Sequence, residues 1–324
     1  MLPPAGILTL IYIQLGCFVT RYKPLIVEVS YLTYFSIRNT IEPVRSPCGS
    51  LANGPDLSDM KITASYYQQY DSDAALDVPG EGYGGWREAE IELSAEHTAV
   101  VVMHAWDTGT SEEYPGWHRC VEYIPRASRI CAEVFPPLLA AVRESRVKLL
   151  HVVGPGDYFK SYPGYRHALD LAGLAPAVDF IPSDPTLDTL RQFRSEHVFV
   201  GKHNQADVDR GFADMDFAEE AKPVGDEGIA ENSEQLFALC REANVNHLIY
   251  AGFAIDGCLL LSPGGMMDMA RRGIMCSAIR QAVTAIECKE TAREELAEQV
   301  ALWRVAVLFG FVFDVDNLIE AVSR

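Results

Sequence analysis

The chain has 324 residues, a hydrophobic content of 48% and a formal net charge of −18. This length allows one large domain with an extension or two domains, and the hydrophobic content is ordinary for a packed globular protein. The negative charge argues against nucleic acid or an anionic membrane as a partner, because both require clustered lysine and arginine.

Residues 1–59 carry none of the chemistry described below. The apolar segment 6–20 is shorter than the roughly 20 residues that span a bilayer, and no basic side chain precedes it. A start at Met60 would give a complete domain, so we expect an over-long gene model, with weak membrane association through residues 6–20 as the alternative. Residues 60–95, rich first in tyrosine and then in glycine, are expected to form an irregular arm.

From residue 96 onward, short apolar runs alternate with amphipathic segments. Strands are predicted at 98–104, 147–153, 197–201, 248–251, 274–277 and 311–313, the last of them at a sheet edge, and helices at 128–146, 233–244, 259–272, 287–308 and 316–322. The connection 154–196 is long enough to suggest a functional loop. The alternation predicts an α/β domain over 96–324, a three-layer α/β/α fold with a mostly parallel central sheet. In such sheets, the site lies at the carboxyl ends of the strands.

Eight cysteines occur without any C-x-x-C pair. This pattern fits reduced thiols in a cytoplasmic protein better than a disulfide framework or a zinc site. One of them, Cys258, lies where a predicted strand passes into a predicted helix. The amides and dipole of a helix start favour a thiolate and can hold an oxyanion. The alternative is that Cys258 is a small buried hydrophobe, as most free cysteines are.

Polar side chains follow three of the predicted strands. His104 and Asp107 follow the first, Lys202 follows the third, and Cys258 follows the fourth. A nearby lysine lowers the pKa of a thiol, and a carboxylate or imidazole can take its proton. Each residue also has a structural interpretation: Lys202 as a solvated charge, Asp107 as a turn cap and His104 as a hydrogen-bonded core histidine.

The segment Gly252-Phe-Ala-Ile-Asp-Gly-Cys258 resembles the nucleophile turn of isochorismatase-like cysteine hydrolases, which include nicotinamidases and N-carbamoyl amidohydrolases. The resemblance covers roughly residues 96–322. It implies a Cys–Asp–Lys triad with Cys258 and Lys202, and a cis peptide between Phe253 and Ala254. The amides of Gly257 and Cys258 are expected to hold the oxyanion.

The first strand departs from the pattern of the family. Where the family has its aspartate, this chain has His104, and Asp107 follows three residues later. His104 can serve as the base, since Cys–His pairs are a known solution to thiol activation. Alternatively, Asp107 reaches back into the site, or the triad is broken and the domain only binds. The register favours His104.

Metal-dependent nicotinamidases carry an Asp-x-His pair after the second strand, and the matching loop here has Asp157 followed by Phe159. We therefore predict neither a catalytic metal nor any other cofactor. Trp106, Trp117 and Tyr114 are expected to line the substrate pocket.

The cysteine points to the amidase-like branch of this family. The resemblance implies hydrolysis of a C–N, amide-like bond of a small metabolite through a thioester, with water as the second acceptor. The alternative is a binding or scaffold protein that kept the fold and lost the base. Homo-oligomers are common in the family, so a homo-oligomer is expected by analogy.

Overall fold

The computed structural model of the protein describes residues 59–173 and 179–324. The predicted extension and its apolar segment 6–20 lie outside these residues, apart from Asp59. Within the described ranges, no helix has both the length and the apolar character needed to cross a membrane.

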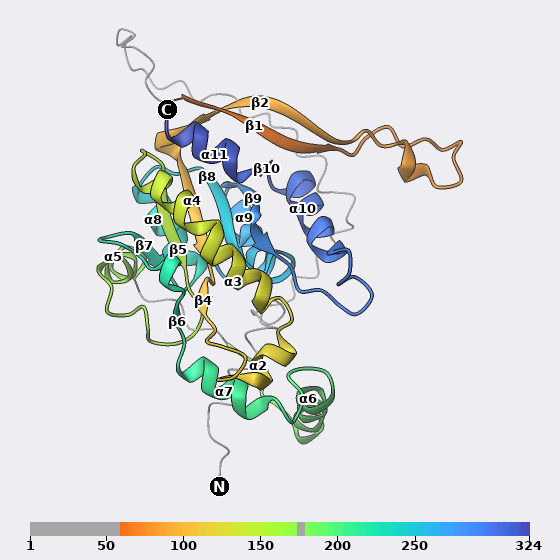
Figure 1. The fold of residues 1–324 in the computed structure, drawn as a ribbon, viewed down its shortest axis with the longest axis vertical. Coiled ribbons are helices and arrows are strands. Elements are labelled where there is room, and N and C mark those ends of the chain that lie inside the picture. The colour runs from red at the N-terminus through yellow and green to blue at the C-terminus, as the bar shows by residue number, and fades with distance from the viewer. Residues whose placement is uncertain (1–58, 174–178) are drawn as a thin grey trace.

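An eight-stranded sheet forms the centre of the molecule (Figure 1). Its strands, in spatial order, are β2 (Gly85–Ser94), β1 (Asp59–Gln68), β10 (Val312–Phe313), β9 (Met275–Thr284), β8 (His247–Phe253), β3 (Thr98–Met103), β5 (Lys148–Val152) and β7 (Gly228–Ala230). The six strands from β10 to β7 are parallel, and β1 and β2 are antiparallel. The predicted mostly parallel sheet is confirmed.

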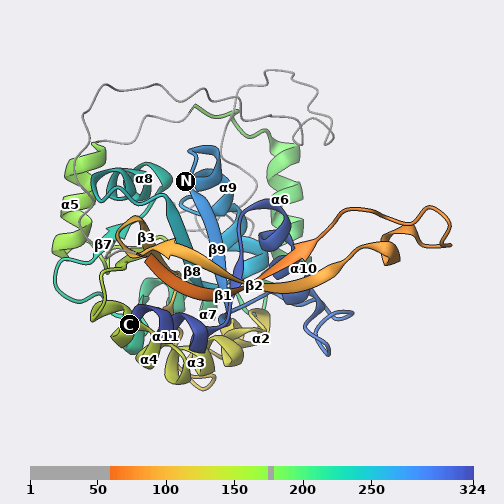
Figure 2. The same ribbon diagram turned by 90° about the horizontal axis from the view of Figure 1, so that it is seen from above.

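Helices cover both faces of the sheet, which gives the three layers predicted from the sequence (Figure 2). One face packs against α3 (Ile124–Glu133), α4 (Phe135–Arg143) and α11 (Val315–Val322). The other packs against α5 (Pro163–Ala172), α8 (Ser233–Glu242), α9 (Met266–Arg271) and α10 (Leu296–Leu308). Strands β3 and β8 are fully buried between these layers, which explains their unbroken apolar runs.

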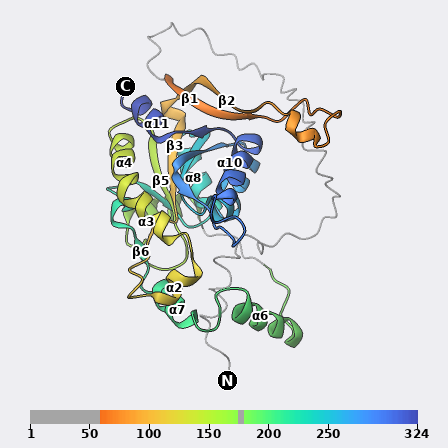
Figure 3. The same cartoon turned by 45° about the vertical axis from the view of Figure 1, so that its right-hand side comes forward.

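A smaller group of elements lies beyond the carboxyl ends of the parallel strands (Figure 3). It consists of the two-residue strands β4 (Trp106–Asp107) and β6 (Asp216–Phe217), and of helices α2 (Pro115–Cys120), α6 (Pro185–His197) and α7 (Gln205–Ala213). Trp117, Val208 and Met215 form a separate apolar cluster there with Val121, Ile124 and Val200. Side chains from this group face the carboxyl ends of the parallel strands, among them Trp106 of β4, Trp117 of α2 and Phe212 of α7.

The prediction of an irregular arm at 60–95 is wrong. Strands β1 and β2 form a hairpin on one side of the sheet, and only the tip between them is irregular (Figure 1). Met60, Ile62 and Ala64 alternate with polar residues and are buried in the core. Because this hairpin adds two strands outside β10, the predicted edge strand at 311–313 lies inside the sheet.

The strand predicted at 197–201 is also wrong. Helix α6 runs to His197, and the residues after it form a turn before α7. The run Val198-Phe-Val200 is apolar, but Val198 is exposed and these residues pair with no strand of either sheet in the described chain. The strand next to β5 in the parallel sheet is instead β7, which is only three residues long. The connection 154–196, expected to be a loop, contains α5 and α6.

Candidate active site

Cys258 and His104 line the same pocket at the carboxyl ends of the parallel strands. His104 follows β3 directly, and Cys258 follows β8 after a short turn. The two strands are neighbours, with Met103 paired to Gly252 in parallel register. The structure thus places His104 and Cys258, the base and nucleophile expected from the sequence, on the wall of one pocket.

Gly252 allows β8 to approach β3 closely at this point. Its φ is +118°, and a Cβ built there would lie 1.9 Å from the Met103 carbonyl oxygen. No side chain fits such a contact with backbone. Gly252 therefore fixes the spacing of the strand ends that carry His104 and Cys258.

The turn after β8 contains the cis peptide between Phe253 and Ala254 that the family resemblance implies. Ile255–Leu259 form a single π-helical turn, η4. The helix predicted at 259–272 is broken at Ser262-Pro-Gly-Gly265, so only α9 follows. Cys258 is partly exposed and lies within this short turn. The sequence predicted that the dipole of a long helix would favour the Cys258 thiolate. In this part of the described chain, no long helix begins at Cys258.

The Gly257 amide donates to the Ala254 carbonyl oxygen at 3.3 Å. The Gly257 amide is therefore used within the turn, whereas the sequence predicted that it would hold the oxyanion. Leu259 donates to the same carbonyl at 3.1 Å. These bonds close the turn that presents Cys258.

His104 has a left-handed backbone, with φ of +54°. This conformation is uncommon for non-glycine residues and is found at functional sites. The side chain is buried, its Nδ1 has no hydrogen-bond partner, and its ring stacks on Trp106. Burial lowers the pKa of His104 to about 4, and a Val153 backbone contact raises it only in part. The imidazole is therefore neutral at physiological pH.

Aromatic side chains form much of the pocket wall. Trp106 and Trp117, both predicted from the sequence, line it together with Phe212 and Phe253. Phe212 packs against Trp117 with ring centroids 5.2 Å apart. Tyr114, also predicted, does not line the pocket. Its ring packs behind Trp117, and its hydroxyl donates to Asp214 at 2.9 Å.

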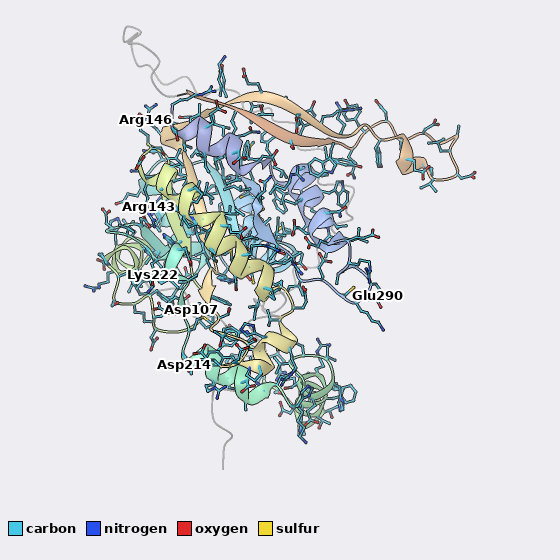
Figure 4. All side chains as sticks on the ribbon, in the orientation of Figure 1. Asp107, Arg143, Arg146, Asp214, Lys222 and Glu290 are labelled. Atoms are coloured by element: carbon cyan, nitrogen blue, oxygen red, sulfur yellow. The ribbon has the colours of Figure 1, made fainter. Side chains whose placement is uncertain are left out.

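Lys202 and Asp107 do not join the pocket, in contrast to the sequence prediction. Lys202 is exposed in the turn before α7, because the strand expected to carry it does not form. Asp107 is exposed at the end of β4, below the sheet in the view of Figure 4. Its carboxylate accepts from the Gly109 amide at 2.9 Å, as a turn cap does. Neither residue is among those that line the pocket.

The sequence reasoning missed the part of the wall that comes from α3 and its approach. These residues are Val121, Tyr123, Ile124, Ala127 and Ser128, with Thr108 opposite. Helix α3 begins at Ile124, four residues before the predicted start. Pro125 at the first turn was the available signal, because proline favours that position of a helix.

Within 59–173 and 179–324, no three His, Cys, Asp or Glu side chains are grouped so as to hold a metal ion. Phe159, which stands where metal-dependent nicotinamidases have histidine, is fully buried. It packs against Tyr158 and Tyr165. This loop is therefore occupied by aromatic packing.

No family model and no curated protein sequence matches the chain. Solved structures do match. A cysteine hydrolase from Pseudomonas syringae pv. phaseolicola 1448A is 15% identical with a TM-score of 0.40, covering 71% of this chain and 94% of its own. An isochorismatase-like hydrolase from Alkaliphilus metalliredigens is 15% identical with a TM-score of 0.41, covering 69% and 98%. The nicotinamidase SaPncA from Staphylococcus aureus is 10% identical with a TM-score of 0.33, covering 67% and 97%.

Proposed function

We propose that this protein is a cysteine hydrolase that cleaves a C–N, amide-like bond of a small metabolite. The observation that carries the proposal is that Cys258 and His104, from neighbouring strands, line one pocket. A partly exposed thiol and a neutral imidazole on the wall of one pocket are the two groups that nucleophilic catalysis by cysteine requires.

The reaction uses a Cys–His pair in place of the Cys–Asp–Lys triad of the family. In the step that we assign, the side chains of Cys258 and His104 first approach each other across the pocket, because His104 Nδ1 has no hydrogen-bond partner in this structure. Nδ1 then accepts the thiol proton as the sulfur attacks the carbonyl carbon. The C–N bond then breaks as the imidazolium returns its proton to the leaving nitrogen, which leaves a thioester. Water attacks the thioester through the same base, so that the acid is released and the thiol is restored.

The thiolate forms in this pocket without a lysine at its side. The imidazole is neutral at physiological pH, so the proton moves to it as the sulfur attacks, and the imidazolium that forms stabilises the negative charge that develops. The backbone amide of Cys258 is the oxyanion donor that we assign. The aromatic side chains of the wall lower the polarity around Cys258 and His104, which strengthens the electrostatic interaction between them.

The test is release of ammonia or amine from a panel of small neutral amides by purified protein, with Cys258→Ala and His104→Asn as variants. We expect loss of activity in the first variant and a decrease of about 10²-fold or more in the second. Unchanged turnover in Cys258→Ala would refute the proposal.

Chemical modification gives a second test that needs no substrate. We expect iodoacetamide at pH 7 to alkylate Cys258 faster than Cys288, which is exposed and outside the pocket. Burial raises the pKa of Cys120 to about 11 and those of Cys131 and Cys240 to about 12, so these thiols serve as slow internal references. Equal rates at Cys258 and Cys288 would favour the scaffold alternative.

A further inference from the structure

The described residues that line the pocket include no charged side chain, since none is aspartate, glutamate, lysine or arginine. The polar ones are His104, Thr108, Tyr123, Ser128 and Cys258. The rest of the wall is aromatic or aliphatic, so the electrostatic character of the pocket depends on these few neutral groups.

Helix α3 carries a charge next to the wall, but this charge is bound elsewhere. Arg126 lies between the wall residues Ile124 and Ala127 in sequence. Its guanidinium makes two bonds of 2.9 Å to the Glu122 carboxylate. It also donates to Thr284 Oγ1 at 2.8 Å and to the Ala285 carbonyl at 3.0 Å. Two of these four bonds hold Arg126 to Glu122 and two hold it to the end of β9, so its guanidinium is occupied by protein groups.

The charges of α2 and α7 are also bound to protein groups. Arg119 donates to Asn204 Oδ1 at 3.1 Å. Asp207 accepts from the Gly116 amide at 2.8 Å and from Arg210 at 3.0 Å. These charged side chains of α2, α3 and α7 are thus held by protein groups, and none of them is among the residues that line the pocket.

We propose that the substrate is uncharged and that its non-reacting part is an aromatic or aliphatic group. This inference rests on the proposed function and names the substrate class of the same site. A carboxylate or ammonium that enters this pocket loses its hydration and meets no opposite charge, which disfavours its binding. A flat apolar group instead gains contact with Trp106, Trp117, Phe212 and Phe253. His104 stays neutral as well, because burial lowers its pKa to about 4.

Three ligands of similar shape test the charge rule: benzamide, benzoate and benzylamine. The readout is protection of Cys258 in the full chain against iodoacetamide, followed by peptide mass spectrometry, with saturation-transfer NMR as a check on binding. We expect benzamide to protect at a concentration at least about tenfold lower than the two charged ligands. Equal protection by benzoate or benzylamine, or no binding of benzamide, overturns the inference.

A charge added to the wall should reverse the preference. Ser128 is exposed at the pocket, and its hydroxyl donates to the Ile124 carbonyl at 2.9 Å. Ser128→Lys is expected to strengthen protection by benzoate by about tenfold and to leave benzylamine weak. Ser323→Lys is the matched control, because its exposed serine makes the same bond to Ile319, at 2.7 Å, outside the pocket. A gain for benzoate in both variants counts against the inference.

The two proposals can fail separately. Selective protection by benzamide with no hydrolysis of any amide leaves the charge rule intact and removes the proposed function. Hydrolysis that depends on Cys258 but proceeds equally well on substrates with a carboxylate keeps the function and removes the charge rule.

Discussion

The imidazole of His104 stacks on the indole of Trp106, with ring centroids 4.8 Å apart and planes 20° apart. The indole N–H in turn donates to the Tyr158 hydroxyl at 3.0 Å. A base that lacks a hydrogen bond at Nδ1 is thereby oriented through its ring face. Trp106 is a positioning residue for the proposed base as well as a pocket wall.

Trp106→Leu removes this stacking and should lower the rate of Cys258 alkylation at pH 7 by about fivefold, since such ring pairs contribute roughly 1 kcal/mol. Tyr158→Phe keeps the indole in place and removes only its hydrogen-bond acceptor, so a smaller decrease is expected. The pH profile of alkylation, measured for both variants, separates a change in the base from general loss of structure. Identical profiles in Trp106→Leu and the parent protein would argue against the positioning role.

Lys202→Ala should keep amide hydrolysis within about twofold of the parent rate, because its ammonium is exposed and outside the pocket. His104→Asn, measured in the same assay, should lose about 10²-fold or more. A large loss in Lys202→Ala would mean that the family triad operates here through a movement of the turn before α7.

Gly252→Ala should cost about 3 kcal/mol or more of unfolding free energy, measured by urea denaturation. Two causes combine: the φ of +118° and the 1.9 Å contact with the Met103 carbonyl. Gly273→Ala isolates the first cause, since its φ is +85° but nothing lies within 4 Å of the added carbon. We expect about 1 kcal/mol there. Similar losses in both variants would show that the strand contact is relieved at little cost.

The unfolding free energy should fall as the pH falls from about 6.5 to about 4. Burial lowers the pKa of both His104 and His247 to about 4, whereas unfolded histidine titrates near 6.5. In this window the unfolded chain binds protons that the folded chain refuses, so protonation favours unfolding. Each histidine contributes up to about 3 kcal/mol. His247→Gln should flatten the dependence between pH 4.5 and 7, and an unchanged slope would contradict this assignment.

The strands that the sequence predicts well are those buried on both faces. β3, β5 and β8 are short apolar runs, and the ends of β3 and β8 place His104 and Cys258 at the same edge of the sheet. The strand β7 escapes this reasoning because Gly228–Ala230 is too short to show a pattern. The run at 198–200 shows the opposite failure, since local apolar character cannot tell a strand from an exposed helix end.

The opposite wall of the pocket depends on packing between distant segments. Phe212 reaches it because α7 packs on α2 and because Gly211 leaves room for Trp117, whose ring would lie 2.2 Å from a Cβ there. Thr108 follows the pairing of β4 with β6, two strands of two residues each. Neither contact has a periodicity that could be detected in the sequence. The hairpin β1–β2, by contrast, has a clear alternation at Met60, Ile62 and Ala64 that should have been recognised as a strand.

That hairpin has a consequence for any shortened form of the protein. Ala64 and Ser65 of β1 pair with Phe313 and Val312, so the hairpin covers the rim of the parallel sheet. A version that begins at residue 96 would leave the backbone donors and acceptors of this rim unpaired, and such rims recruit strands from other molecules. The hairpin lines no part of the pocket, yet by covering the rim of the sheet that carries it the hairpin protects that sheet from self-association.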